Sequence, residues 1–193
     1  GEVIKLHDLL DEAIRRAESA INEKNPELVG DERDDVARTV GIGAVKYADL
    51  STERTKDYVF DWERMLSFEG NTAPYLQYAY ARICSIFRKW EGERDSLTSV
   101  ELILTHPEEL FLARRLADFP SALDESISTF SPHKLCTNLH SIASSFASFY
   151  ENCNVLKGEG EEVIRSRLAM CDLTARELKL GLGLMGIGVP ERM

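Results

Sequence analysis

Apolar side chains recur along most of this chain with the spacing of one face of an α-helix. Between residues 8 and 22 the pattern puts apolar residues on one side and charged residues on the other. The same pattern predicts further helices over residues 31–47, 72–91, 107–119, 122–130, 132–150 and 161–181. No segment alternates with the period of two that marks a half-buried strand. The sequence therefore predicts an all-α protein, a helical bundle with short connections.

Residues with special backbone preferences set some helix boundaries. Asp8 is a candidate N-cap for the first helix. Thr72 is a candidate N-cap for the helix over residues 72–91, and Pro74 fits its first turn, where the missing N–H would be unpaired anyway. Gly41 and Gly43, inside the second helix, cost stability unless a neighbouring backbone packs against them.

The stretch from residue 60 to residue 82 combines unusual features. Phe60 to Phe68 is expected to plug the core, and residues 69–72 to form a turn. The helix that follows places Tyr75, Tyr78 and Arg82 on one stripe. Aromatic residues so spaced more often belong to a core, but an arginine beside them can pair with phosphate or stack on a base. The pattern alone leaves a core stripe and a stacking face both open.

Composition and charge narrow the classes of function. The 193 residues are 44% hydrophobic and 29% charged, as in a soluble globular protein, and no apolar run approaches the roughly 20 residues of a membrane helix. The net charge is −10; residues 1–73 carry 10 basic and 17 acidic side chains, and residues 74–193 carry 13 and 16. Neither part has the basic excess of a general nucleic-acid binder. Any contact with RNA must therefore come from a local patch and from stacking.

The candidate metal and redox residues lead to structural interpretations. The four cysteines, Cys84, Cys136, Cys153 and Cys171, are far apart, which argues against zinc and favours buried, reduced thiols in a cytoplasmic protein. The acidic run at residues 31–35 favours a helix start over a metal site, because acids complement the helix dipole there. We assign no metal ligand.

Two further patterns could indicate dinucleotide binding or catalysis, but the residues around them do not support either function. Gly181, Gly183 and Gly186 match the dinucleotide pattern Gly-x-Gly-x-x-Gly, but they follow a helix and not a strand, so they indicate a glycine-rich helix exit. The four histidines form no grouping with a nucleophile that spacing could support. We assign no catalytic residue.

Residues 58–82, YVFDWERMLSFEGNTAPYLQYAYAR, strongly resemble arginyl-tRNA synthetases, which are class I aminoacyl-tRNA ligases. The segments VGIGAVKYADL (40–50) and DLTARELK (172–179) support the resemblance. The ending GIGVPERM (186–193) looks like the usual C-terminus of this family, which suggests that this end is intact. Essentially the whole chain is covered.

The resemblance implies that this chain is a C-terminal fragment that begins just after the catalytic machinery. Neither the His-x-Gly-His motif nor the lysine-rich ATP-binding loop of such ligases is present. The fragment alone should therefore be inactive and hold no cofactor, whereas the parent enzyme would use ATP with Mg²⁺. Residues 1–70 resemble the helical connector from the end of the catalytic domain, and residues 71–193 resemble the helical anticodon-binding domain.

The resemblance also assigns a binding site. Tyr75, Tyr78 and Arg82 match family positions that face the anticodon loop of tRNA(Arg). Tyr150 and Met193 match others, aligned by their distance from the terminus. The implied mechanism is capture of unstacked bases against aromatic rings, with Arg82 holding phosphate or base edges.

The expected function is tRNA(Arg) anticodon recognition, as part of a cytoplasmic, monomeric ligase without a membrane segment. Its partners would be tRNA(Arg) and the missing N-terminal and catalytic domains of the same protein. The alternative is a non-catalytic helical protein-interaction module, in which the tyrosines pack internally and the acidic connector docks a partner. Full burial of both Tyr75 and Tyr78 would favour that alternative.

Overall fold

The computed structural model describes residues 5–57, 59–157 and 160–193, and every regular element in those ranges is helical. The elements are α1 (Leu6–Lys24), α2 (Gly30–Leu50), α3 (Trp62–Met65), α4 (Ala73–Lys89), the 3-10 helix η1 (Arg94–Leu97), α5 (Pro107–Ala117), α6 (Phe119–Ser128), α7 (Pro132–Asn152) and α8 (Glu161–Leu184). The all-α prediction is confirmed. The short helices α3 and η1 were not predicted.

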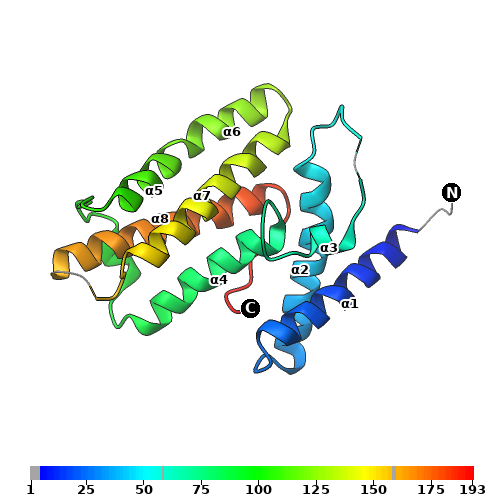
Figure 1. Ribbon diagram of the computed structural model, residues 1–193, viewed down its shortest axis with the longest axis horizontal. Helices are drawn as coiled ribbons and strands as arrows, with labels where there is room; N and C mark the ends of the chain where they lie inside the picture. The colour runs from blue at the N-terminus through cyan, green and yellow to red at the C-terminus, as the bar shows by residue number, and fades with distance from the viewer. Residues whose placement is uncertain (1–4, 58, 158–159) are drawn as a thin grey trace.

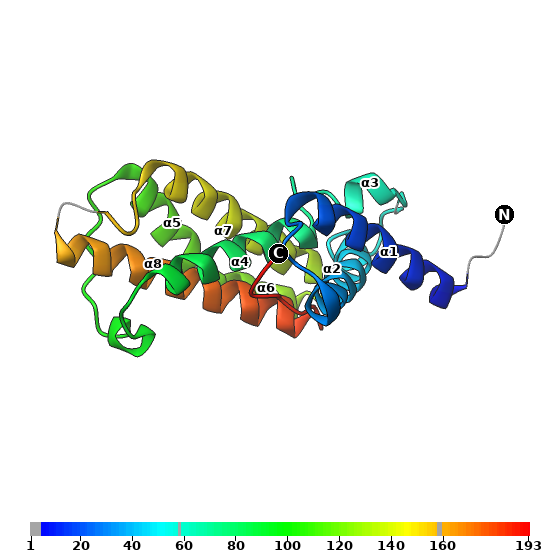
Figure 2. The same ribbon diagram turned by 90° about the horizontal axis from the view of Figure 1, so that it is seen from below.

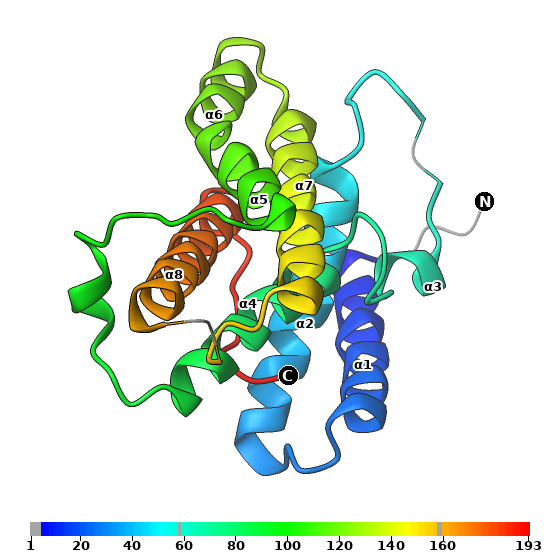
Figure 3. The same cartoon turned by 60° about the vertical axis from the view of Figure 1, so that its left-hand side comes forward.

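The helices form a hairpin beside an elongated bundle. Figure 1 shows α1 and α2 paired on one side, while α4, α5, α7 and α8 run along the other, with α6 continuing beyond α5. Figure 3 shows α4, α5, α7 and α8 gathered around a common interior. Helix α2 contacts both α1 and α4, so it joins the hairpin to the bundle.

The two regions have separate cores. The bundle interior is filled by large side chains of α4, α7 and α8, among them Leu76, Phe146 and Leu168. The hairpin core is smaller and consists of residues from α1, α2 and their connection: Ala17, Ile21, Leu28, Val36, Ala37 and Val40. Met193, from the far end of the chain, packs against this second core.

A glycine allows the hairpin to close tightly. A Cβ on Gly41 would lie 2.7 Å from the carbonyl oxygen of Ala13 and 2.8 Å from the Cα of Ile14. Gly43 faces Gln77 and Ile187 at similarly short range. The close backbone approach predicted for these glycines is confirmed at Gly41, where it offsets the cost of a glycine within a helix, whereas Gly43 meets side chains.

Two of the expected N-caps have different outcomes. The Thr72 hydroxyl accepts a hydrogen bond from the backbone N–H of Tyr75 (3.2 Å), so this N-cap of α4 is confirmed. The Asp8 prediction is wrong, because α1 already begins at Leu6 with Lys5 at the N-cap position.

The expected core plug is confirmed only in part. Met65 is buried and Leu66 packs against the hairpin core, as expected, but Phe60 is 40% exposed. Phe60 meets the Trp62 ring edge-on (4.7 Å between centroids), and the Arg16 guanidinium lies 5.2 Å from the Trp62 ring. The single turn of α3 covers the outside of the hairpin and does not reach the bundle interior (Figure 1), so these rings pack on the surface.

The residues after α8 fold back over both regions. Gly186 (φ +68) reverses the chain, which makes the glycine-rich segment a helix exit, as predicted. Gln77 Nε2 on α4 donates to the Gly188 carbonyl (2.8 Å), and Asn25 Nδ2 at the end of α1 donates to the Met193 carbonyl (3.1 Å). The C-terminus therefore lies beside the end of α1 (Figure 2).

The described residues contain neither an exposed thiol nor a helix that could span a membrane. All four cysteines are buried and form no disulfide, as predicted, and burial raises the pKa of the Cys136 thiol to about 12. Such thiols are poor nucleophiles. Over the described ranges, no helix combines the length and apolar character that crossing a membrane requires.

Candidate nucleic-acid interface

The predicted stripe on α4 lies at the surface of the bundle and not in its core. Tyr75, Tyr78 and Arg82 are each half-buried. The Tyr75 ring lies against the His140 ring of α7, with 5.6 Å between centroids. Neither Tyr75 nor Tyr78 is fully buried. The structure therefore does not favour the alternative of a protein-interaction module in which these tyrosines pack internally.

Arg82 lies between two tyrosine rings. Its Nη2 donates to the Tyr78 hydroxyl (3.0 Å), and its guanidinium carbon is 4.8 Å from the Tyr78 centroid and 5.2 Å from the Tyr150 centroid. Tyr150 is in the last turn of α7 and is 39% exposed. Cation–π attraction in this arrangement holds three planar groups together, each still open to solvent on part of its surface.

Four of the five predicted site residues line one groove, here called the α4 groove. Its volume is about 520 Å³, and its lining residues are Asn25, Tyr78, Ala81, Arg82, Ser85, Arg88, Tyr150, Arg192 and Met193. Tyr75 lies outside it, because its ring is turned onto His140. The groove thus combines α4, the end of α7, the end of α1 and the C-terminal tail.

The α4 groove is locally basic although the chain is acidic. Three of its described lining residues are arginines and none is Asp or Glu. Arg88 Nη1 donates to the Glu191 carbonyl (3.0 Å), and Arg192 is 3.4 Å from the Glu32 carboxylate. The charged side chains that line the groove are therefore basic although the net charge of the chain is −10.

A second hollow adjoins the groove on the far side of the Arg82–Tyr150 pair. Its volume is about 500 Å³; Arg82, Ser85 and Tyr150 line both spaces, and Lys89 and residues 151–157 line only the second. Arg167 of α8 holds the loop after α7, because its Nη1 donates to the Asn154 carbonyl (3.0 Å). Its Nε also pairs with the fully buried Glu109 carboxylate (2.6 Å).

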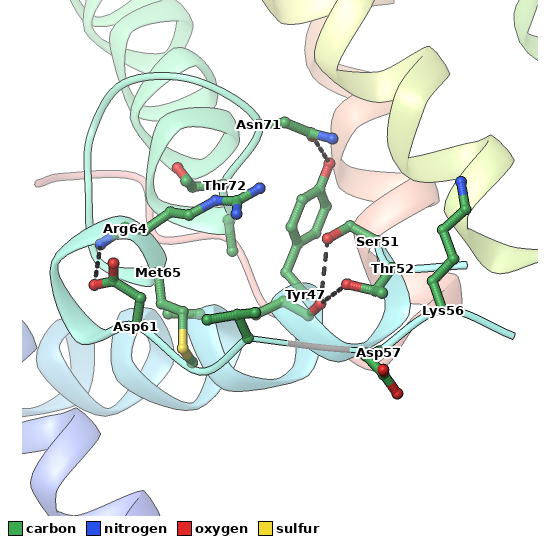
Figure 4. A pocket seen from close by; sticks show the side chains of 14 residues that line it. Tyr47, Ser51, Thr52, Lys56, Asp57, Asp61, Arg64, Met65, Asn71 and Thr72 are labelled. Carbon is green, nitrogen blue, oxygen red and sulfur yellow. Dashed lines mark hydrogen bonds between the residues drawn. The ribbon is translucent and has the colours of Figure 1, made fainter. Parts of the chain in front are cut away.

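A further hollow of about 230 Å³ lies between α2, α3 and the segment that joins them (Figure 4). The single O–H of the buried Tyr47 there is shared between two acceptors, Asn71 Oδ1 (2.7 Å) and the Cys136 carbonyl (3.0 Å), and burial raises the Tyr47 pKa well above its usual range. These bonds tie α2 to α7 and to the turn before α4. None of the predicted site residues lines this hollow.

Several groove residues were not predicted. Ser85 and Arg88 follow Tyr78 at i+7 and i+10, so continuing the helical period along α4 would have found them. Asn25 and Arg192 carry no such signal, since the fold brings them together from opposite ends of the chain.

A sequence model described as the DALR anticodon binding domain matches residues 76–193. The chain belongs to this family. Four of the five predicted site residues lie within the matched range: Tyr78, Arg82, Tyr150 and Met193. The fifth, Tyr75, lies one position before it. A second model, tRNA synthetases class I (R), catalytic domain, matches residues 1–62.

This chain is also similar to arginine–tRNA ligases. The similarity confirms the resemblance seen in the sequence. The chain is 51% identical to the arginine–tRNA ligase of Citrobacter koseri over 193 residues, which is all of this chain and 33% of that protein. Among solved structures, Thermus thermophilus arginyl-tRNA synthetase has a TM-score of 0.87 and 34% identity, covering 99% of this chain and 32% of that one. Plasmodium falciparum arginyl-tRNA synthetase has a TM-score of 0.88 and 33% identity, covering 99% and 34%. The DALR chain thus spans about a third of the length of these relatives.

Proposed function

We propose that this chain recognises the anticodon of tRNA(Arg) as part of an arginine–tRNA ligase. The observation that carries the proposal is the convergence of Tyr78, Arg82, Tyr150 and Met193 on one groove that is basic within an acidic chain. The DALR match and the similarity to arginine–tRNA ligases support it.

In the proposed mechanism, unstacked bases of the anticodon loop enter the α4 groove and stack on the tyrosine rings. Each stacked base contributes on the order of 1–3 kcal/mol. Arg82, fixed between Tyr78 and Tyr150, holds a phosphate or a base edge with its N–H groups. Tyr75 extends the aromatic row beyond the groove, on the ring of His140.

The same proposal also covers the domain division, the cofactors and the activity of this chain by itself. Residues 1–70 would be the helical connector of the ligase and residues 71–193 its anticodon-binding domain. ATP and Mg²⁺ would be bound by the catalytic part of a longer, cytoplasmic and monomeric enzyme, and this chain by itself would not activate arginine. Absence of arginine-dependent ATP–pyrophosphate exchange is the expected result, and any exchange would contradict this part.

Titration of the tRNA(Arg) anticodon stem-loop into the chain tests the main proposal. Tyr78→Ala, Arg82→Ala and Tyr150→Ala should each raise Kd, by about 5- to 150-fold for a lost stacking partner. Phe111→Ala is the matched control, because Phe111 is an exposed aromatic residue of α5 that does not line the groove. Unchanged affinity in all three groove variants would overturn the proposal.

A further inference from the structure

The end of α1 places an ammonium group at the edge of the α4 groove. Lys24 Nζ lies 4.5 Å from the centroid of the Phe68 ring and 5.2 Å from that of Tyr78. The two rings meet edge to face, with 6.1 Å between centroids. The next residue, Asn25, lines the groove itself. The hairpin that precedes the bundle therefore reaches the same tyrosine that the proposed RNA site uses.

Lys24 differs from its neighbours in how its charge is balanced. Arg192 pairs with Glu32 (3.4 Å), and Arg33 of α2 pairs with Glu18 (3.2 Å). Lys24 is exposed and, within the described ranges, pairs with no carboxylate. An ammonium that rests on aromatic rings keeps its charge and N–H donors for an arriving anion.

The same position bears on access to Tyr78. In the free chain the Lys24 ammonium rests over the ring that a base would have to approach. The four-carbon lysine stem is flexible, so side-chain rotation alone can move the ammonium off the ring. A base that stacks there carries its phosphates along the rim of the groove, within reach of the displaced ammonium.

We propose that Lys24 binds a backbone phosphate of the RNA. When a base stacks on the Tyr78 ring, the Lys24 ammonium leaves the ring and pairs with the phosphate. The connector hairpin then supplies part of the RNA-binding surface. This inference rests on the proposed function, because it needs an RNA base in the α4 groove.

The test is the salt dependence of binding to the anticodon stem-loop. Lys24→Met keeps the apolar stem and removes the charge. One lost phosphate contact on single-stranded RNA makes the negative slope of log K against log salt shallower by about 0.7. This change corresponds to an affinity loss of about 8-fold near 50 mM salt, and the loss vanishes towards ~1 M. Lys24→Arg should retain both affinity and slope. Lys179→Met is the matched control, since Lys179 is an exposed lysine of α8 that lines neither space beside Arg82.

The outcomes separate this inference from the proposed function. Wild-type affinity and slope in Lys24→Met would overturn the phosphate contact. A lower melting temperature with an unchanged slope would also overturn it, because Lys24 would then only hold the connector against Tyr78. If Tyr78→Ala binds weakly while Lys24→Met binds normally, this inference alone fails. If the groove variants Tyr78→Ala, Arg82→Ala and Tyr150→Ala all bind like the wild type, the proposed function fails and the inference fails with it.

Discussion

The two sides of α4 carry the same kinds of residue to different ends. On the side turned into the bundle core, Tyr80 is 5% exposed and burial raises its pKa to about 12. Two positions away, Tyr78 is half-buried and its hydroxyl accepts a hydrogen bond from Arg82. Residue type does not distinguish these tyrosines. Their position around the helix axis does, together with what lies opposite.

Three consecutive residues of α4 sample this difference directly. Leu76 is fully buried in the bundle core, and Tyr78 lines the groove. Between them, Gln77 is fully buried against α2 and the tail, where its Nε2 donates to the carbonyls of Thr39 and Gly188. Substitutions at the three positions should separate stability from RNA binding, with effects that decrease in size along the series.

The largest effect is expected at Leu76. Leu76→Ala removes a fully buried side chain and leaves a cavity, which should lower the free energy of unfolding by about 2–5 kcal/mol. Urea denaturation measures this loss. The affinity for the anticodon stem-loop, measured where the variant is still folded, should stay within about twofold of the wild type, because the Leu76 side chain lies in the bundle core and does not line the groove. A Kd raised as far as in Tyr78→Ala would break the separation between the two sides of the helix.

An intermediate effect is expected at Gln77. Gln77→Met keeps the side-chain size but leaves the Gly188 carbonyl without this donor, which should cost about 1–3 kcal/mol. Because the tail carries Arg192 and Met193 into the groove, RNA binding should weaken as well. Amide hydrogen exchange would report faster exchange in residues 186–193. Unchanged exchange and unchanged Kd would show that the tail is held by its other contacts.

The smallest effect is expected from removing one hydroxyl. Tyr78→Phe keeps the stacking ring and deletes the acceptor of the Arg82 hydrogen bond, which is worth about 0.5–1.5 kcal/mol, or about 2- to 12-fold in Kd. The melting temperature should barely change. Tyr150→Phe is the control, since it deletes a hydroxyl on the other side of Arg82 and keeps the ring. If Tyr78→Phe loses as much affinity as Tyr78→Ala, the hydroxyl and not the ring is what RNA binding requires.

Local chemistry explains what could be predicted of the fold. The apolar period placed the long helices, the Thr72 cap and Pro74 marked the start of α4, and two glycines in α2 anticipated the close approach of α1 at Gly41. Each of these signals acts over a few residues, so it can be read without knowing the fold. The expected plug at residues 60–68 holds for Met65 and Leu66 but not for Phe60, because a hydrophobic ring alone does not show whether a single turn reaches a core or covers a surface.

The sequence by itself determined the helical architecture, the family resemblance and the stripe of Tyr75, Tyr78 and Arg82. Only the tertiary structure decided that Tyr75 turns onto His140 and that Lys24, Asn25 and Arg192 border the groove. The physical reason is that a helical period relates residues of one helix, whereas a groove is built where separate helices and a returning tail meet. Its charge is local for a similar reason: solvent-exposed charges are screened beyond about 8 Å at physiological salt, so a basic groove can exist on a chain of net charge −10.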